Sequence, residues 1–120
     1  MKKILAVDDS VSIRKSISFI LGNEGYEVVE AEDGVDGLKK AKAEKFELVI
    51  TDINMPNMDG IQLIRELRKL PGYKFAAIIA LTTENQQSKM MEGKEAGATG
   101  WIVKPFDSEK LIAVVKKIIG

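Results

Sequence analysis

The sequence predicts an α/β fold in which helices cover both faces of one open, five-stranded parallel sheet. Three observations support this prediction. Short apolar runs alternate with helix-like segments five times along the 120 residues, and such a βα repeat builds a parallel sheet because its crossovers are right-handed. Several runs are apolar at nearly every position, as strands covered on both faces are. Five units are too few for a closed eight-stranded barrel. We therefore expect a doubly wound sheet in a single domain, residues 1–120.

Five segments of strand length are expected to form this sheet. In chain order they are residues 3–7, 26–30, 47–51, 76–81 and 99–103. The first, third and fourth are almost entirely apolar, which predicts strands that are buried on both faces.

Amphipathic segments between the runs predict the helices. The helix after the first strand is expected to use Ser10 as its N-cap, the helix after the third strand Asp59, and the last helix Asp107. In the same order, the predicted apolar faces are Ile13, Ile17, Ile20 and Leu21, then Leu63, Ile64, Leu67 and Leu70, and then Leu111, Val114, Val115 and Ile118.

The segment 85–95 has a weaker helical pattern. It contains few apolar anchors, an internal glycine at Gly93, and two flexible methionines, Met90 and Met91. We expect a marginal, movable helix here, and a solvated surface helix without a function is the alternative.

Composition excludes several classes of function. The 18 basic residues balance the 18 acidic ones, so there is no basic excess for nucleic acid or an anionic membrane. The chain has no cysteine and no histidine, which excludes disulfides, thiolate chemistry, histidine-ligated zinc and phosphohistidine carriers. No apolar run is long enough for a signal peptide or a membrane span. A soluble, cytoplasmic protein is expected.

Acidic residues follow two of the predicted strands. Asp8 and Asp9 come after the first strand and Asp52 after the third, so in a parallel sheet the three carboxylates converge on one edge and repel each other unless a cation lies among them. Carboxylates and phosphate oxygens are the ligands that Mg²⁺ prefers. A carboxylate beside such a metal is able to act as a nucleophile toward phosphorus. Thr82 and Lys104, at two further strand ends, supply a hydroxyl and an ammonium for phosphoryl oxygens.

Over its whole length the chain resembles the receiver domain of bacterial two-component response regulators, and within that family the stand-alone, CheY-like chemotaxis regulators. The motifs are Val7-Asp8-Asp9-Ser10, Asp52-Ile53-Asn54-Met55-Pro56, Leu81-Thr82 and Val103-Lys104-Pro105-Phe106, with weaker support from Thr82-Thr83-Glu84 and Ala96-Gly97-Ala98-Thr99-Gly100-Trp101. The resemblance implies the flavodoxin-like receiver fold. It also implies that Asp52 is the phosphoacceptor, and that Mg²⁺ is held by Asp8, by Asp9 as a direct ligand, by Asp52, and by the main-chain carbonyl of Asn54.

The resemblance also implies a switch. Thr82 and Lys104 would bind phosphoryl oxygens, and the Lys104–Pro105 peptide bond would be cis. In the family, a shift of the threonine opens a space that an aromatic residue three places before the lysine fills, which remodels the surface formed here by residues 85–119. Trp101 stands where tyrosine or phenylalanine is usual, and its larger ring leaves the extent of rotation open. A partly buried strand residue or a partner-binding anchor is the other interpretation of Trp101.

The lifetime of the phosphoryl group depends on the residue two places after the phosphoacceptor. Phosphatases of the haloacid dehalogenase type have a proton-transferring aspartate there, whereas this chain has Asn54. An amide does not transfer that proton, so we expect a phosphoryl group that persists. In relatives, side chains at the positions of Asn54 and Glu84 border the attacking water and tune hydrolysis.

Three classes of function follow. The preferred one is a signalling module, not an enzyme with an external substrate. It would take phosphate from a CheA-like histidine kinase and bind a target through residues 85–119, and the flagellar motor switch is the expected target. It would act as a monomer and have a phosphatase as a further partner. The second is a phosphorelay intermediate or a regulator of a process other than motility. The third is a metal-dependent phosphatase or a nucleotide-binding protein, and the absence of a glycine-rich loop after the first strand disfavours nucleotide binding.

Overall fold

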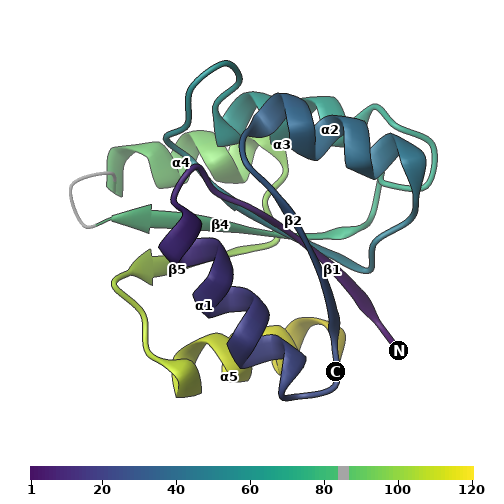
Figure 1. Ribbon diagram of the computed structural model, residues 1–120. Helices are drawn as coiled ribbons and strands as arrows, with labels where there is room; N and C mark the ends of the chain where they lie inside the picture. Colours follow the sequence, from purple (N-terminus) through teal and green to yellow (C-terminus); the bar gives the residue numbers. More distant parts are fainter. Residues whose placement is uncertain (84–86) are drawn as a thin grey trace.

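The computed structural model describes residues 1–83 and 87–120, and strands and helices alternate throughout them (Figure 1). The strands are β1 (Lys3–Val7), β2 (Glu27–Ala31), β3 (Leu48–Asp52), β4 (Ala77–Thr83) and β5 (Gly100–Lys104). The helices are α1 (Val11–Gly22), α2 (Gly34–Ala43), α3 (Gly60–Arg68), α4 (Gln87–Ala96) and α5 (Ser108–Ile119). The βα repeat expected from the sequence is confirmed.

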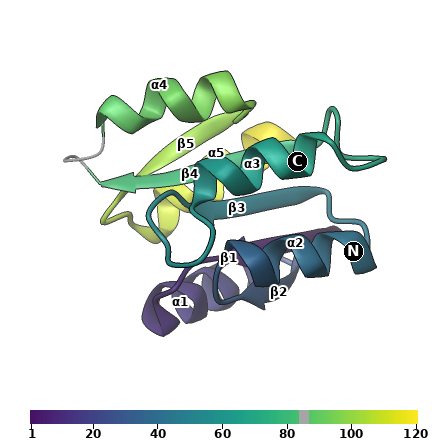
Figure 2. The ribbon, with the colours of Figure 1, turned by 90° about the horizontal axis from the view of Figure 1, so that it is seen from above.

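The five strands form one sheet in the order β2-β1-β3-β4-β5, and every neighbouring pair is parallel. Figure 2 shows the strands following one another in this order. The chain places β2 on one side of β1 and β3 on the other, so the winding of the sheet reverses beside β1. Such a switch point leaves a crevice outside the carboxyl ends of β1 and β3, where open α/β sheets bind their ligands.

The core lies in layers on both faces of the sheet. Along β1, Ile4 and Ala6 face the layer under α1 and α5, whereas Leu5 and Val7 face the layer under α2 and α3. This alternation follows from the two-residue period of a strand, and it explains why the run is apolar at every position. Figures 1 and 2 agree that α1 and α5 cover one face and that α2, α3 and α4 cover the other.

The first strand has the ends that the sequence indicated, whereas β2 to β5 end one or two residues later. Asp52 is the last residue of β3 and pairs with Leu81, and Lys104 is the last residue of β5 and pairs with Thr83. Polarity at these positions suggested loop, but parallel pairing uses backbone groups and is indifferent to a polar side chain at the strand end. The functional side chains are therefore carried by the sheet itself.

The helices begin where their caps were expected. The side chains of Ser10, Asp59 and Asp107 each accept a backbone N–H bond, from Ile13, Gln62 and Lys110 respectively. Leu70 lies beyond the end of α3 and is partly buried in the core, although the sequence included it in that helix.

Helix α4 has the composition expected of a marginal helix. Most of its described side chains are exposed, including Met91 at 64%. Residues 84–86, including Glu84 and the first positions of the expected 85–95 segment, lie outside the described residues. Among the helices that the structure describes, none has the length and hydropathy needed to cross a membrane.

Candidate functional site

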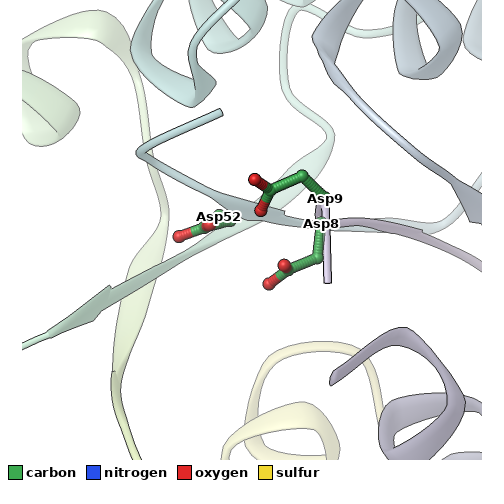
Figure 3. Close-up of side chains that lie close together, drawn as sticks. All are labelled: Asp8, Asp9 and Asp52. Carbon is green, nitrogen blue, oxygen red and sulfur yellow. The ribbon is translucent and has the colours of Figure 1, made fainter. Parts of the chain in front are cut away.

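Three carboxylates converge at the switch point of the sheet. Asp8 and Asp9 follow β1 and Asp52 ends β3, and one carboxylate oxygen from each lies within 4.8 Å of the others. Figure 3 shows the three side chains pointing toward the same side from these two neighbouring strands. Asp8 is fully buried and Asp52 nearly so, whereas Asp9 is exposed. The arrangement predicted from the strand ends is therefore present, with its open side at Asp9.

The ammonium of Lys104 lies between two of these carboxylates. Its Nζ is 3.3 Å from Oδ1 of Asp52 and 3.4 Å from Oδ2 of Asp8, and the lysine side chain is only 16% exposed. With three carboxylates and one ammonium, the cluster of described side chains keeps two uncompensated negative charges. A divalent cation would neutralise them.

Burial sets the electrostatics of the two inner aspartates. Desolvation raises the pKa of Asp8, although a backbone hydrogen bond from Ser10 and the charge of Lys104 oppose the rise. Desolvation also raises the pKa of Asp52, and the negative charge of Asp8 adds to that effect. Ionising both groups therefore costs free energy in the protein alone, and a cation beside them would recover that free energy.

Thr82 brings a hydroxyl to the same edge of the sheet. It lies near the end of β4, directly beside Val103 of β5, and is fully buried. Its Oγ1 has no hydrogen-bond partner within residues 1–83 and 87–120. Since buried polar groups are nearly always paired, this hydroxyl is a donor available to an acceptor that enters the site.

The loop after Asp52 is tightly packed beneath the site. The backbone N–H of Asn54 donates to the Asp52 carboxylate, while the residue itself is exposed. A Cβ at Gly60 would lie 2.0 Å from the main-chain oxygen of Asp52, so only glycine fits. Asn57 has a φ of 68° and donates from Nδ2 to Asp33 at 2.8 Å.

Trp101 and Pro105 complete the residues expected from the sequence. Trp101, on β5, is partly buried and packs against the small apolar cluster formed by Ile53, Ile61 and Ala80. This is the partly buried strand position that the sequence offered as one interpretation. The Lys104–Pro105 peptide bond is cis, as predicted.

Sequence reasoning missed several residues that support the site. Asp33 caps α2 and holds Asn57, and Arg14 of α1 donates to the main-chain oxygen of Asp8. The Asp-Gly pairs at 33–34 and 59–60 were a usable signal for tight capped turns. No comparable signal marked Arg14, because its contacts depend on how α1 lies against β2.

Comparison with known proteins identifies the family. Residues 4–116 match the family described as the response regulator receiver domain. The chain belongs to this receiver family. It is 38% identical to the chemotaxis protein CheY of Bacillus subtilis over 98% of both chains. It also matches PhoP of the same organism, a transcriptional regulatory protein of alkaline phosphatase synthesis, but spans only 48% of the length of that protein.

Solved receiver structures agree with this assignment. The chemotaxis response regulator CheY4 of Vibrio cholerae superimposes with a TM-score of 0.94 at 47% identity, covering 98% of each chain. The receiver domain of the sensor histidine kinase PA1611 from Pseudomonas aeruginosa superimposes with a TM-score of 0.91 at 28% identity over 99% of this chain and 98% of that one, and it has a magnesium ion in its active-site cleft. The receiver fold and the likeness to CheY expected from the sequence are confirmed.

The donor set fits the magnesium ion that receiver domains hold in their acidic pocket. All three clustered side chains offer hard carboxylate oxygens, which Mg²⁺ prefers. The uncompensated charge of the cluster and the raised pKa values of Asp8 and Asp52 both favour a divalent cation. Asp9, the exposed member, leaves room on the solvent side for the water ligands that Mg²⁺ usually keeps.

Proposed function

We propose that this chain is a single-domain response regulator, residues 1–120, that accepts a phosphoryl group on Asp52 from a histidine kinase in a Mg²⁺-dependent reaction. The observation that supports this proposal most is that an ammonium, two carboxylates and a hydroxyl gather around one buried carboxylate. Asp52 has an ammonium 3.3 Å away, two further carboxylates nearby, and at the same sheet edge the hydroxyl of Thr82, which has no partner among the described residues.

The metal ligands in this proposal are the carboxylates of Asp8, Asp9 and Asp52 with the main-chain carbonyl of Asn54. When bound, the ion supplies positive charge beside the reacting oxygens and lowers their mutual repulsion. Asp9 is the most accessible of the three carboxylate ligands, since Asp8 and Asp52 are buried.

In the transfer, a carboxylate oxygen of Asp52 attacks the phosphorus of a phosphohistidine on the kinase. The P–N bond of the donor breaks, an acyl phosphate P–O bond forms, and the imidazole leaves with its electron pair and takes up a proton. The ammonium of Lys104, already beside Asp52, and the hydroxyl of Thr82 would then donate to the new phosphoryl oxygens. Asn54 and Glu84 would tune the later hydrolysis by bordering the attacking water.

The output would be a changed surface over residues 85–119. Phosphorylation would give Thr82 and Lys104 an acceptor that they share, so their movement would couple the site to Trp101, near the start of β5, and to Pro105, which directly follows Lys104. Trp101 packs against the apolar cluster that contains Ile53, the residue after Asp52, so this cluster links β5 to the end of β3.

We further propose that this surface binds the flagellar motor switch in chemotaxis, with a CheA-like kinase as donor, a phosphatase as a further partner, and a cytoplasmic, monomeric regulator. The support is similarity to CheY and CheY4 along nearly the full length of both chains.

The phosphoacceptor is tested by intact mass after incubation with acetyl phosphate, with Mg²⁺ or with EDTA. One added phosphoryl group is expected only with Mg²⁺, and an Asp52→Ala variant should gain none. A metal-independent adduct, or an adduct on the variant, would contradict the assignment.

The target is tested separately by the affinity of a motor switch peptide for the two phosphorylation states. Tighter binding of the phosphorylated protein is expected, with a coupling of about 1–3 kcal/mol. Equal affinities would instead favour a phosphorelay intermediate or a regulator of another process.

A further inference from the structure

Arg14 links the acidic cluster to the edge of the sheet. Its Nη1 donates to the main-chain oxygen of Asp8 at 2.6 Å, and its Nε lies 3.4 Å from Oε1 of Glu30 on β2. The arginine side chain is only 14% exposed. The guanidinium therefore joins the turn after β1 to the neighbouring edge strand.

The oxygen that Arg14 holds belongs to the peptide between the two metal-site aspartates. The carbonyl of Asp8 and the N–H of Asp9 share one rigid plane, so the orientation of that carbonyl sets the direction in which Asp9 leaves the turn. The other side of Asp8 is fixed independently, because its backbone N–H donates to the oxygen of Ala31. Its side chain is also fixed, by the backbone N–H of Ser10 at 2.9 Å.

The guanidinium is itself held in place by a carboxylate with several partners. Besides Arg14, Glu30 accepts from Ser18 at 2.9 Å and from Lys15 at 3.2 Å. Burial works to raise the pKa of Glu30, but the hydrogen bonds from Ser18, Lys15 and Arg14 outweigh it and the pKa falls below its ordinary value. Glu30 is therefore ionised at neutral pH and keeps Arg14 aimed at Asp8.

We propose that Arg14, held by Glu30, is a positioning residue of the metal site: it fixes the Asp8–Asp9 peptide and thereby places the carboxylate of Asp9 against Asp52. The inference rests on the proposed function. A planar guanidinium is suited to this task because its separate N–H groups reach a carbonyl and a carboxylate at once, which a lysine ammonium does with less directional control.

The test is the Mg²⁺ dissociation constant, measured by amide chemical-shift titration on variants shown to be folded by circular dichroism. Arg14→Ala is expected to weaken Mg²⁺ binding about tenfold, the lower end of what outer-shell partners contribute. Arg14→Lys should recover part of the loss. Arg65→Ala is the control, because it removes an exposed guanidinium from α3, and the Mg²⁺ affinity of this variant should stay within about twofold of wild type.

The outcomes separate this inference from the function on which it rests. A wild-type protein that neither binds Mg²⁺ nor accepts phosphate would overturn the proposed function. A wild type that does both, with a folded Arg14→Ala variant of unchanged Mg²⁺ affinity, would overturn only the positioning role. If Arg14→Ala does not fold, Glu30→Gln takes its place: weaker Mg²⁺ binding supports the role, and wild-type affinity refutes it.

Discussion

Thr82 carries a buried hydroxyl that is unpaired within the described part of the chain. An unsatisfied buried polar group costs about 1–3 kcal/mol, so its presence here weakens the resting protein. We predict that Thr82→Val, which keeps the shape, raises the free energy of unfolding by about 1 kcal/mol, measured by urea denaturation without a phosphodonor.

Thr51 provides a matched control for this prediction. It is equally buried, but its hydroxyl donates to the main-chain oxygen of Asp52 at 2.9 Å. Thr51→Val should therefore lower the free energy of unfolding. Destabilisation of both variants alike would show that the Thr82 hydroxyl is satisfied in solution.

Asp52 is predicted to destabilise the metal-free protein at neutral pH. Burial raises its pKa, so the folded state binds the proton more tightly than the unfolded chain does. Stability contributed by this group therefore falls as pH rises from the ordinary carboxyl range through the higher folded pKa. In EDTA, Asp52→Asn should raise the free energy of unfolding at pH 7, and the gain should shrink as pH falls below the ordinary pKa of an aspartate.

Asp33 offers the opposite sign within the same protein. Hydrogen bonds from the backbone of Asp36 and then from Asn57 lower its pKa, so its contribution is present above the ordinary value and is lost as pH falls through the folded pKa. Asp33→Asn should therefore lower the free energy of unfolding at pH 7, and this loss should shrink as pH falls through the folded pKa. The free energy of unfolding of both variants is measured by urea denaturation from about pH 3 to about pH 7, a window that brackets the ordinary pKa of an aspartate. If the two variants changed with pH in the same direction, the opposite pKa shifts of Asp52 and Asp33 would be contradicted.

At the scale of elements, the described part of α4 has few buried apolar side chains, and the glycine inside the helix and the glycine just after it should respond oppositely to alanine. Gly93 lies inside α4, and a Cβ there meets nothing within 4 Å. Gly93→Ala is predicted to stabilise the protein by about 0.5–1 kcal/mol by reducing the freedom of the unfolded chain. Gly97 ends the helix at a φ of 120°, and its Cβ would lie 2.8 Å from Nε of Arg68, so Gly97→Ala should destabilise. Thermal unfolding of the two variants tests this prediction. If both substitutions raised the melting temperature, the described end of α4 would be contradicted.

The elements that the sequence located best are those with strong periodicity and a polar cap. The apolar faces around Ile17, Leu67 and Leu111 and the caps before them were recoverable because the signals are local. The first strand was placed with its observed ends, whereas β2 to β5 end one or two residues further along the chain. In β3, β4 and β5 backbone pairing continues past the last apolar side chain of the run.

The site was predictable only as far as it depends on strand ends. Asp8, Asp52 and Lys104 follow apolar runs, and a parallel sheet brings such positions to one edge. The contacts of Arg14 with Glu30 and of Asn57 with Asp33 join residues 16 and 24 positions apart. They arise from the way loops and helices pack, which no local pattern encodes.

At the scale of the whole molecule, the proposed signalling function requires that phosphorylation at the site and target binding at the surface are energetically coupled. Lys104 contacts Asp8 and Asp52 on one side and belongs to β5 on the other. We predict that Lys104→Ala still accepts phosphate but loses most of the expected coupling of about 1–3 kcal/mol between phosphorylation and target binding. The coupling is measured from the affinity of the phosphorylated and of the unphosphorylated variant for the motor switch peptide. Lys39→Ala, an exposed lysine on α2, is the control, and full coupling in Lys104→Ala would refute its role.

The lack of space beside Gly60 limits which substitutions this chain tolerates. Any side chain at that position collides with the oxygen of Asp52, so the glycine is required for the backbone to close, whereas the carboxylate of Asp52 is not. In a saturation library selected only for soluble expression, position 60 should remain glycine while position 52 diversifies. Selection for the proposed signalling response should then keep aspartate at position 52 as well as glycine at position 60. Sequencing the two pools would show which residues serve architecture and which serve chemistry.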